Sequence, residues 1–209
     1  NWCGDHYFYA KGDSVWGAKP EKNEQVLFTR SQLNEALQKA ELPTVGQLPS
    51  FTVPYQDANS HILAFTQKRS LLHYDYKKGT IVARYALKAN WQNLDFCPAN
   101  RQFAFTQGNN LYLLSSEGDT TVVTNEQEEG IVCGQAVHQR EFGISKGTFW
   151  SPKGTALAFY RMDERMVTTY PLVDINSRCA SLMPHKYPMA GMKSHEGLPN
   201  ELVGIVGQE

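Results

Sequence analysis

The chain has 209 residues, of which 41% are hydrophobic and 11% aromatic, enough for one large or two small globular domains. Its 20 basic and 21 acidic residues leave a net charge of -1, so no long-range field favours binding to nucleic acid or to an anionic membrane. No apolar run reaches the roughly 18 residues of a membrane span. The first residues lack the charged and apolar regions of a signal peptide, so if the protein is exported we expect its signal to have been removed.

The four cysteines are widely spaced and form no pattern typical of a zinc site, so we expect neither a metal nor another cofactor. One disulfide is open to an exported protein, but four cysteines allow three pairings and the spacing does not choose among them. The residues concerned are Cys3, Cys97, Cys133 and Cys179.

The first predicted unit covers about residues 5–48 and combines strands with one helix. Two strands flank a Lys-Gly-Asp turn, and the segment EQVLFTR supplies a third strand. The segment 31–40 then departs from the strand pattern, because Ser31 can cap a helix and four apolar residues fall on one helical face. These four are Leu33, Ala36, Leu37 and Ala40. We therefore predict one short helix at 31–40.

A repeat follows, since the motif AFTQ occurs at residues 64–67 and again, 40 residues later, at 104–107. A third and looser copy, TALAFYR, places its alanine, Ala158, 54 residues after the second. In each of the last two copies a proline stands six residues before the alanine, next to turn-forming residues. Each unit is therefore expected to begin as a β-hairpin.

About four strands in each repeat of roughly 40 residues is typical of a β-propeller blade. We predict a mainly β fold of about four antiparallel four-stranded blades; the alternative is a β-sandwich whose hairpins look alike. All 209 residues would belong to one propeller domain, with one more blade starting at 201–206. The units after the first are 50–88, 91–125 and 147–192.

The segment between the third and fourth units, about residues 126–146, is longer than the repeat requires. The spacing between the alanines rises from 40 to 54 residues, a surplus of 14. Insertions between repeats project from one face, where repeat folds usually place their binding loops. We interpret this insert, which contains the charged run HQREFGISKG, as the candidate site; the alternative is a solvated loop. The pair Glu128-Glu129 within it is interpreted as a turn.

The segments WSPKGTALAFYRMDE, TTYPLVDI and KYPMAGM occur in this order near the end of the chain. They resemble the N-terminal β-propeller of the dipeptidyl peptidase IV family, serine peptidases of the prolyl oligopeptidase type, and bacterial members above all. The resemblance runs from about residue 7 to the end. It implies that the chain is part, about half, of an eight-bladed propeller.

The resemblance also implies a site residue. In the family, the insert before the WSP strand carries a Glu-Glu pair that binds the free amino terminus of the substrate. Glu141 stands nine residues before Trp150 and matches the second glutamate, whereas Arg140 occupies the first position. A carboxylate on a rigid element can count substrate residues from their free end by pairing with the ammonium group. The alternative is a surface ion network of Glu141 with Arg140, His138 or Lys146.

The function implied by the resemblance is that of a substrate-binding and access-gating propeller in an exopeptidase that releases short N-terminal peptides, after proline. The chain has no G-x-S-x-G frame, so we expect no catalytic residue in it and an α/β-hydrolase domain beyond it. The parent protein would be an enzyme, and these residues alone would be inactive. A prolyl tripeptidyl peptidase is one alternative, because a single anchor beside Arg140 leaves latitude for a longer product. A non-enzymatic binding or scaffold propeller is the other.

The expected partners follow from the same interpretation. They are a peptide substrate, the C-terminal hydrolase domain and the remaining blades of the same chain. We also expect a homo-oligomer, because a partial propeller exposes the faces and edges of its terminal blades. No nucleic acid is expected, and the resemblance implies a periplasmic or extracellular location in a bacterium.

Overall fold

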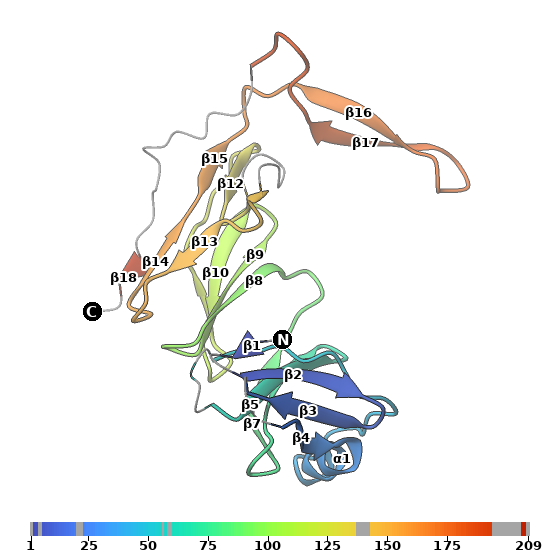
Figure 1. The fold of residues 1–209 in the computed structure, drawn as a ribbon. Coiled ribbons are helices and arrows are strands. Elements are labelled where there is room, and N and C mark those ends of the chain that lie inside the picture. The colour runs from blue at the N-terminus through green and yellow to red at the C-terminus, as the bar shows by residue number, and fades with distance from the viewer. Residues whose placement is uncertain are drawn as a thin grey trace. The chain divides into compact units, whose positions relative to one another are not determined.

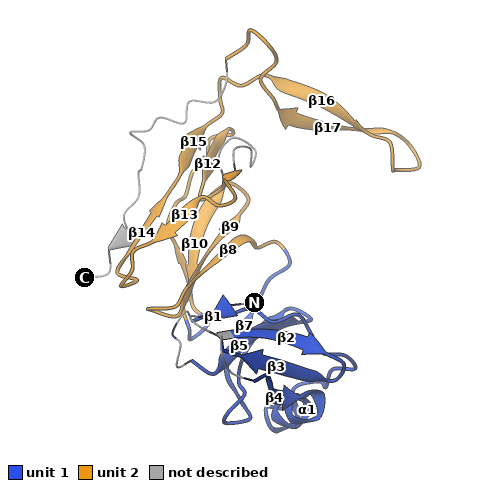
Figure 2. Cartoon of the chain, in the orientation of Figure 1, with its two compact units in different colours: residues 1–89, 116–118 blue, residues 90–115, 119–209 orange. Residues whose placement is uncertain are grey.

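The computed structural model describes residues 2–3, 6–19, 23–55, 57, 60–136, 143–193 and 206–207 (Figure 1). The chain forms two compact units, shown in blue and orange in Figure 2. Unit 1 contains residues 1–89 and 116–118, and unit 2 contains residues 90–115 and 119–209. The structure is mainly β, with several small antiparallel sheets and one helix among the described residues. The predicted fold class is confirmed in these features.

The first sheet of unit 1 is four-stranded and antiparallel, with its strands in chain order. Gly12, at φ +59°, closes the predicted turn between the second and third strands, since a left-handed backbone favours glycine. In the third strand, Val15 and Gly17 are buried while Ser14 and Trp16 are half-buried, as expected of a sheet with one covered face, and only the final residue, Ala18, departs from this alternation. The strands are β1 (Trp2–Cys3), β2 (His6–Lys11), β3 (Ser14–Ala18) and β4 (Gln25–Thr29).

The predicted helix is confirmed as α1 (Arg30–Lys39), although its cap differs from the one expected. Thr29, two residues before Ser31, is the N-cap: its hydroxyl accepts from the Gln32 backbone N–H at 3.3 Å. The Gln32 side chain accepts in return from the Thr29 backbone N–H at 2.8 Å, which completes a capping box. Leu33, Ala36 and Leu37 are buried as predicted, while Ala40 is the C-cap and is exposed.

The second sheet of unit 1 contains β5 (Ile62–Gln67), β6 (Ser70–Asp75) and β7 (Thr80–Ala86) in chain order. The first AFTQ motif lies in β5 and ends at a two-residue turn that begins with Lys68, at φ +52°. In place of a fourth strand, Thr52 makes an isolated bridge to Ala64. Aromatic side chains fill the core of this unit, where the ring of Phe28 meets those of Phe51 and Tyr74 edge-on.

The first sheet of unit 2 is four-stranded and lies within residues 91–125. It contains β8 (Gln92–Cys97), β9 (Gln102–Gln107), β10 (Asn110–Leu114) and β11 (Thr120–Val122), and neighbours in sequence are neighbours in the sheet. The second AFTQ motif lies in β9 and ends at a two-residue turn that begins with Gly108, at φ +58°. The two motifs therefore occupy equivalent places, each closing a hairpin with a positive φ at the same position.

The remaining strands of unit 2 divide among three small sheets. The hairpin of β13 (Thr148–Trp150) and β14 (Ala156–Phe159) is joined by β18 (Val206–Gly207). The strand β12 (Ile131–Cys133), which lies within the insert, pairs with β15 (Arg161–Asp163). The expected unit over 147–192 thus shares its strands among several sheets. Leu157 and Phe159 pack with Ile131 and Leu111 in one buried cluster, which joins these sheets to the first.

The strands β16 (Thr169–Asp174) and β17 (Ser181–Lys186) form a hairpin (Figure 1). Its residues are exposed or half-exposed. Apolar side chains that are at least two-fifths exposed occur on both strands, among them Leu172, Val173 and Leu182. No helix in the described part of the chain is long and apolar enough to cross a membrane.

Candidate functional site

The two residues predicted to bind a substrate amine, Arg140 and Glu141, lie in segment 137–142, outside the described residues. The described parts of the insert flank this segment on both sides and belong to unit 2. Their contacts define the base from which the segment departs. The pair Glu128-Glu129 lies in a turn before β12, as predicted.

The N-terminal side of the base is held by backbone and side-chain bonds. The N–H of Gly134 donates to the carbonyl of Tyr160 at 2.8 Å, and the Gln135 side-chain amide donates to the carbonyl of Gly108 at 3.0 Å. Upstream, the Glu126 carboxylate accepts from the Arg161 guanidinium at 2.8 Å. This side of the insert is thereby attached both to β15 and to the AFTQ hairpin.

The C-terminal side of the base is fixed by Asp95 of β8. Its carboxylate pairs with the Lys146 ammonium at 3.2 Å and accepts from the buried Thr148 hydroxyl at 2.8 Å. The indole N–H of Trp150 donates to the Asp95 backbone carbonyl at 3.2 Å. Lys146, one of the partners considered for Glu141 in a surface ion network, therefore already has an acidic partner.

The two sides of the base touch each other. Gly147 lies so close to Gln135 that a Cβ atom at position 147 would clash with the Gln135 carbonyl oxygen. The N–H of Tyr160 donates to the Gly147 carbonyl at 2.9 Å and holds this approach in place. The chain therefore passes through one place twice, at Gln135 after β12 and at Gly147 before β13.

A pocket of about 670 Å³ lies in unit 2 beside this base, and both Gln135 and Ala136 line it. Further lining residues come from β8 (Gln92, Asn93), from β15 and the turn after it (Met162, Glu164, Val167), and from β17 (His185, Lys186). Burial raises the pKa of the half-buried Glu164 carboxyl, while His185 and Lys186 act in the opposite direction. The pocket thus combines amide, charged and apolar groups.

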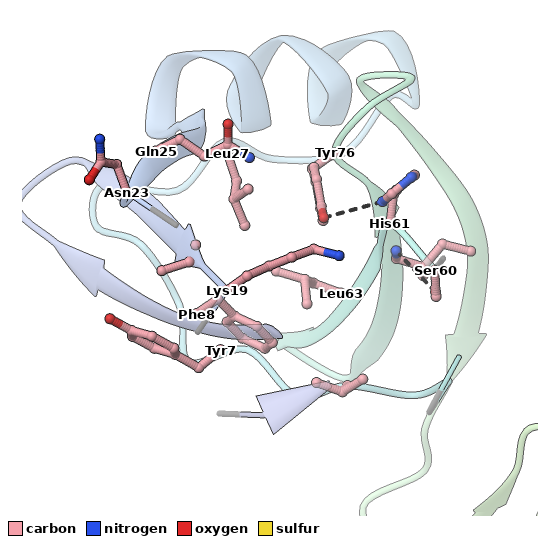
Figure 3. Close-up of a pocket in the computed structure, with 14 residues that line it drawn as sticks. Tyr7, Phe8, Lys19, Asn23, Gln25, Leu27, Ser60, His61, Leu63 and Tyr76 are labelled. Atoms are coloured by element: carbon pink, nitrogen blue, oxygen red, sulfur yellow. Dashed lines mark hydrogen bonds between the residues drawn. The ribbon is translucent and has the colours of Figure 1, made fainter. Parts of the chain in front are cut away.

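A second pocket, of about 250 Å³, lies in unit 1, and no sequence pattern pointed to it (Figure 3). Phe8, Leu27 and Leu63 give it an apolar lining, and Lys19 extends across it in the direction of His61. His61 Nδ1 and the Tyr76 hydroxyl are hydrogen-bonded at 3.3 Å on its rim. This arrangement suits a small group with an apolar body and a polar end.

Nearby, the exposed Glu24 carboxylate accepts hydrogen bonds from Tyr9 at 2.8 Å and from Tyr7 at 3.0 Å. These two bonds lower the pKa of Glu24. Tyr7 also lines the pocket of unit 1, so the Glu24 contact fixes one of its walls.

Within the described ranges, no group of three or more histidine, cysteine, aspartate or glutamate side chains could hold a metal ion. Cys97 and Cys133 are buried free thiols, and Cys179 is an exposed one. The fourth cysteine, Cys3, has a side chain that lies outside the description. Burial raises the pKa of the Cys133 thiol, which keeps it protonated and unreactive.

The small antiparallel sheets and the repeated AFTQ hairpins are consistent with a partial propeller-like arrangement, in which the insert anchored at its base is a candidate binding segment. The family model for the dipeptidyl peptidase IV N-terminal region matches residues 59–196. The chain belongs to this family.

Similar proteins agree with this assignment. The chain is 42% identical to a candidate dipeptidyl aminopeptidase IV of Bacteroides ovatus, whose crystal structure superposes with a TM-score of 0.80 over 93% of this chain and 26% of that one. Dipeptidyl aminopeptidase B of Saccharomyces cerevisiae is 30% identical over 103 residues, which are 45% of this chain and 13% of the yeast protein. Dipeptidyl peptidase 4 of Porphyromonas gingivalis, 20% identical with a TM-score of 0.60 over 92% of this chain and 29% of that one, shares the fold. The chain thus spans about a quarter of the solved relatives and less of the curated one.

Proposed function

We propose that this chain is the substrate-binding and access-gating part of a dipeptidyl peptidase IV-like serine exopeptidase. The whole protein would release short N-terminal peptides after proline, with its nucleophile on an α/β-hydrolase domain outside these residues. It would work in the periplasm or outside a bacterial cell. The family match over residues 59–196, which includes the insert, is the observation that carries this proposal.

Within this proposal, Glu141 binds the free amino terminus of the substrate. A hydrogen bond between an ammonium group and a carboxylate is charge-assisted and directional, so it can set the distance from the chain end to the scissile bond. The base of the insert supports this role, because the contacts of Asp95 and Gln135 attach it to β8 and to the AFTQ hairpin. The pairing of Lys146 with Asp95 also removes one competitor for Glu141.

Arg140 is the observation that favours tripeptide release as a second candidate. A guanidinium beside Glu141 offsets part of the negative charge that two adjacent carboxylates would supply. With one carboxylate in place of two, the amino terminus of the substrate is held less strictly at one distance from the scissile bond. This suits a product that is longer by one residue. A scaffold propeller without enzymatic activity is disfavoured by the names of the relatives, which are all dipeptidyl aminopeptidases or peptidases.

We also propose that the protein self-associates. The exposed apolar side chains on β16 and β17 support this, because a two-stranded hairpin is only marginally stable in water without a covering surface.

The substitution Glu141→Gln in the complete protein tests the proposed site, since it keeps the side-chain shape and removes the charge. A hydrogen bond to a charged group is worth about 1.5–3 kcal/mol, so kcat/KM should fall roughly ten- to a hundred-fold for peptides with a free amino terminus. Blocked peptides, which cannot make the contact, should be unaffected. Arg140→Glu should shift the ratio of products toward dipeptides. Equal effects of Glu141→Gln on free and blocked peptides would refute the assignment.

A further inference from the structure

The pocket of about 670 Å³ in unit 2 contains a carboxylate that the proposed function does not use. Glu164 follows β15, and its backbone N–H donates to the Gly130 carbonyl at 2.6 Å, which fixes its position beside the start of β12. Its side chain is half-buried and makes no hydrogen bond or ion pair with the described residues. Removing a carboxylate from water without giving it a partner costs free energy, which a cationic ligand would recover.

The negative charge of Glu164 itself favours a cation as its ligand, and two basic residues also line the pocket. Lys186 also lines the pocket, but its ammonium donates to the Val167 carbonyl at 2.9 Å. His185 is exposed at the rim. Among the described residues, the Glu164 carboxylate therefore has no hydrogen-bonded partner, whereas the Lys186 ammonium has one.

Amide side chains give the rest of the pocket a polarity suited to peptide groups. The Asn93 amide donates to the Thr106 hydroxyl at 2.8 Å, and the Gln135 amide donates to the Gly108 carbonyl at 3.0 Å. These bonds fix the NH₂ ends of both amides and leave their oxygen atoms as acceptors. Gln92 and Asn109 line the same pocket. Fixed amide oxygens accept hydrogen bonds from the N–H groups of a bound main chain.

Apolar side chains cover the remaining surface of the pocket. Val132 and Met162 come from paired positions of β12 and β15, and Val167 and two prolines complete the lining. A cavity of this size holds a short peptide, since ligand pockets of about 300–1,000 Å³ take ligands of comparable bulk. Amide oxygens, apolar walls and one carboxylate that has no ion pair within the described ranges together describe a site for a peptide that carries a positive charge.

We propose that this pocket is a peptide-binding subsite in which Glu164 binds a primary ammonium group. Only the choice of a peptide as the ligand rests on the proposed function. The ammonium group can be a lysine side chain or the amino terminus of the peptide. Gln135 and Ala136 place the subsite directly before the segment that contains Arg140 and Glu141, so a peptide held here lies next to the base of the insert.

Calorimetric titration of the 209-residue chain with three matched peptides tests the proposal. The first is Gly-Lys-Gly with an acetylated amino terminus and an amidated carboxyl terminus, and the second has norleucine in place of lysine. The third is the norleucine peptide with a free amino terminus, so the α-amino and side-chain ammonium groups are tested separately. At least one ammonium peptide should bind roughly ten-fold or more tightly than the fully blocked norleucine peptide, the ratio expected for a hydrogen bond between charged groups.

Two variants locate the effect. Glu164→Gln, which keeps the side-chain shape, should reduce the ratio of the affinities for the ammonium peptide and the blocked norleucine peptide to about one. Glu129→Gln removes the same charge from an exposed residue of the same unit that does not line the pocket, and it should leave the preference unchanged. Labelled methionine methyl groups provide a second measurement, because the signal of Met162 should shift on addition of the ammonium peptide.

The proposal is overturned if the chain binds all three peptides equally, or if Glu164→Gln keeps the preference of the unaltered chain. A Met162 signal that stays in place while the peptide binds would also overturn it, because the ligand would then occupy another surface. Glu141→Gln in the same titration should retain a preference for the lysine peptide. Failure of the Glu164 subsite is therefore distinguishable from failure of the amine site proposed at Glu141.

Discussion

Asp95 is expected to stabilise unit 2 mainly through its hydrogen bond with Thr148 and only slightly through its ion pair with Lys146. The Thr148 hydroxyl, on a residue that is 1% exposed, donates to the Asp95 carboxylate at 2.8 Å. A hydrogen bond to a charged group of this kind contributes about 1.5–3 kcal/mol. The Lys146 side chain is 50% exposed, and an ion pair in such a position contributes about 0–1 kcal/mol.

The two contributions can be separated by substitution. Asp95→Ala should lower the free energy of unfolding by about 2–3 kcal/mol, because it also leaves the Thr148 hydroxyl buried without a partner. Lys146→Ala should cost less than about 1 kcal/mol, and added salt should reduce this cost. Asp95→Asn, which keeps an acceptor for Thr148, should fall between the two.

Urea-induced unfolding followed by NMR measures these effects locally. The indole N–H of Trp150 donates to the backbone carbonyl of Asp95, so its signal reports on this part of the sheet even when the side chain at position 95 is changed. A double-mutant cycle of Asp95→Ala with Thr148→Val gives the coupling between the two side chains. The reasoning would be refuted by a coupling near zero, or by a cost of Lys146→Ala as large as that of Asp95→Ala.

Two further predictions concern Tyr74 and Gly147. Burial raises the pKa of Tyr74 to about 12, so the folded state favours the neutral phenol, and stability should fall as pH rises from about 10 to about 12. Tyr74→Phe should remove this part of the pH dependence in urea titrations at several pH values, whereas an unchanged slope would contradict the assignment. In urea titrations, Gly147→Ala should lower the free energy of unfolding of unit 2 by about 2–3 kcal/mol, because the alanine Cβ would clash with the Gln135 carbonyl. Gly46→Ala, where no atom lies within 4 Å of the added Cβ, is the matched control, and equal costs at the two positions would argue against the clash.

The local part of the fold could be predicted from the sequence because its signals are local. The AFTQ motifs predicted two hairpins, and β5 and β9 contain them at equivalent positions. The helix was predicted from its apolar spacing, but its N-cap is Thr29 and not Ser31, because Gln32 stands three residues after Thr29 and completes a capping box with it.

The pairing of β12 with β15 could not be predicted in the same way. Each strand has three residues, too few for an alternating pattern, and about 30 residues separate them in the chain. Glu164 was not recognised as a candidate, because the sequence does not show which carboxylates become partly buried on folding without forming a hydrogen bond or an ion pair. The pocket around it combines residues from Gln92 to Pro188, which only the folded chain brings together.

The contact between Gly147 and Gln135 has a consequence for how this protein can evolve. A segment whose two ends meet can change in length without moving the strands on either side, and each doubling of its length costs only about 0.6 kcal/mol in closure entropy. The residues between Ala136 and Lys146 can therefore be lengthened, shortened or exchanged while Asp95 keeps its contacts with Lys146 and Thr148, and Gln135 keeps its contact with the AFTQ hairpin. Related proteins could in this way acquire a different preference for substrate length by altering one segment of about ten residues.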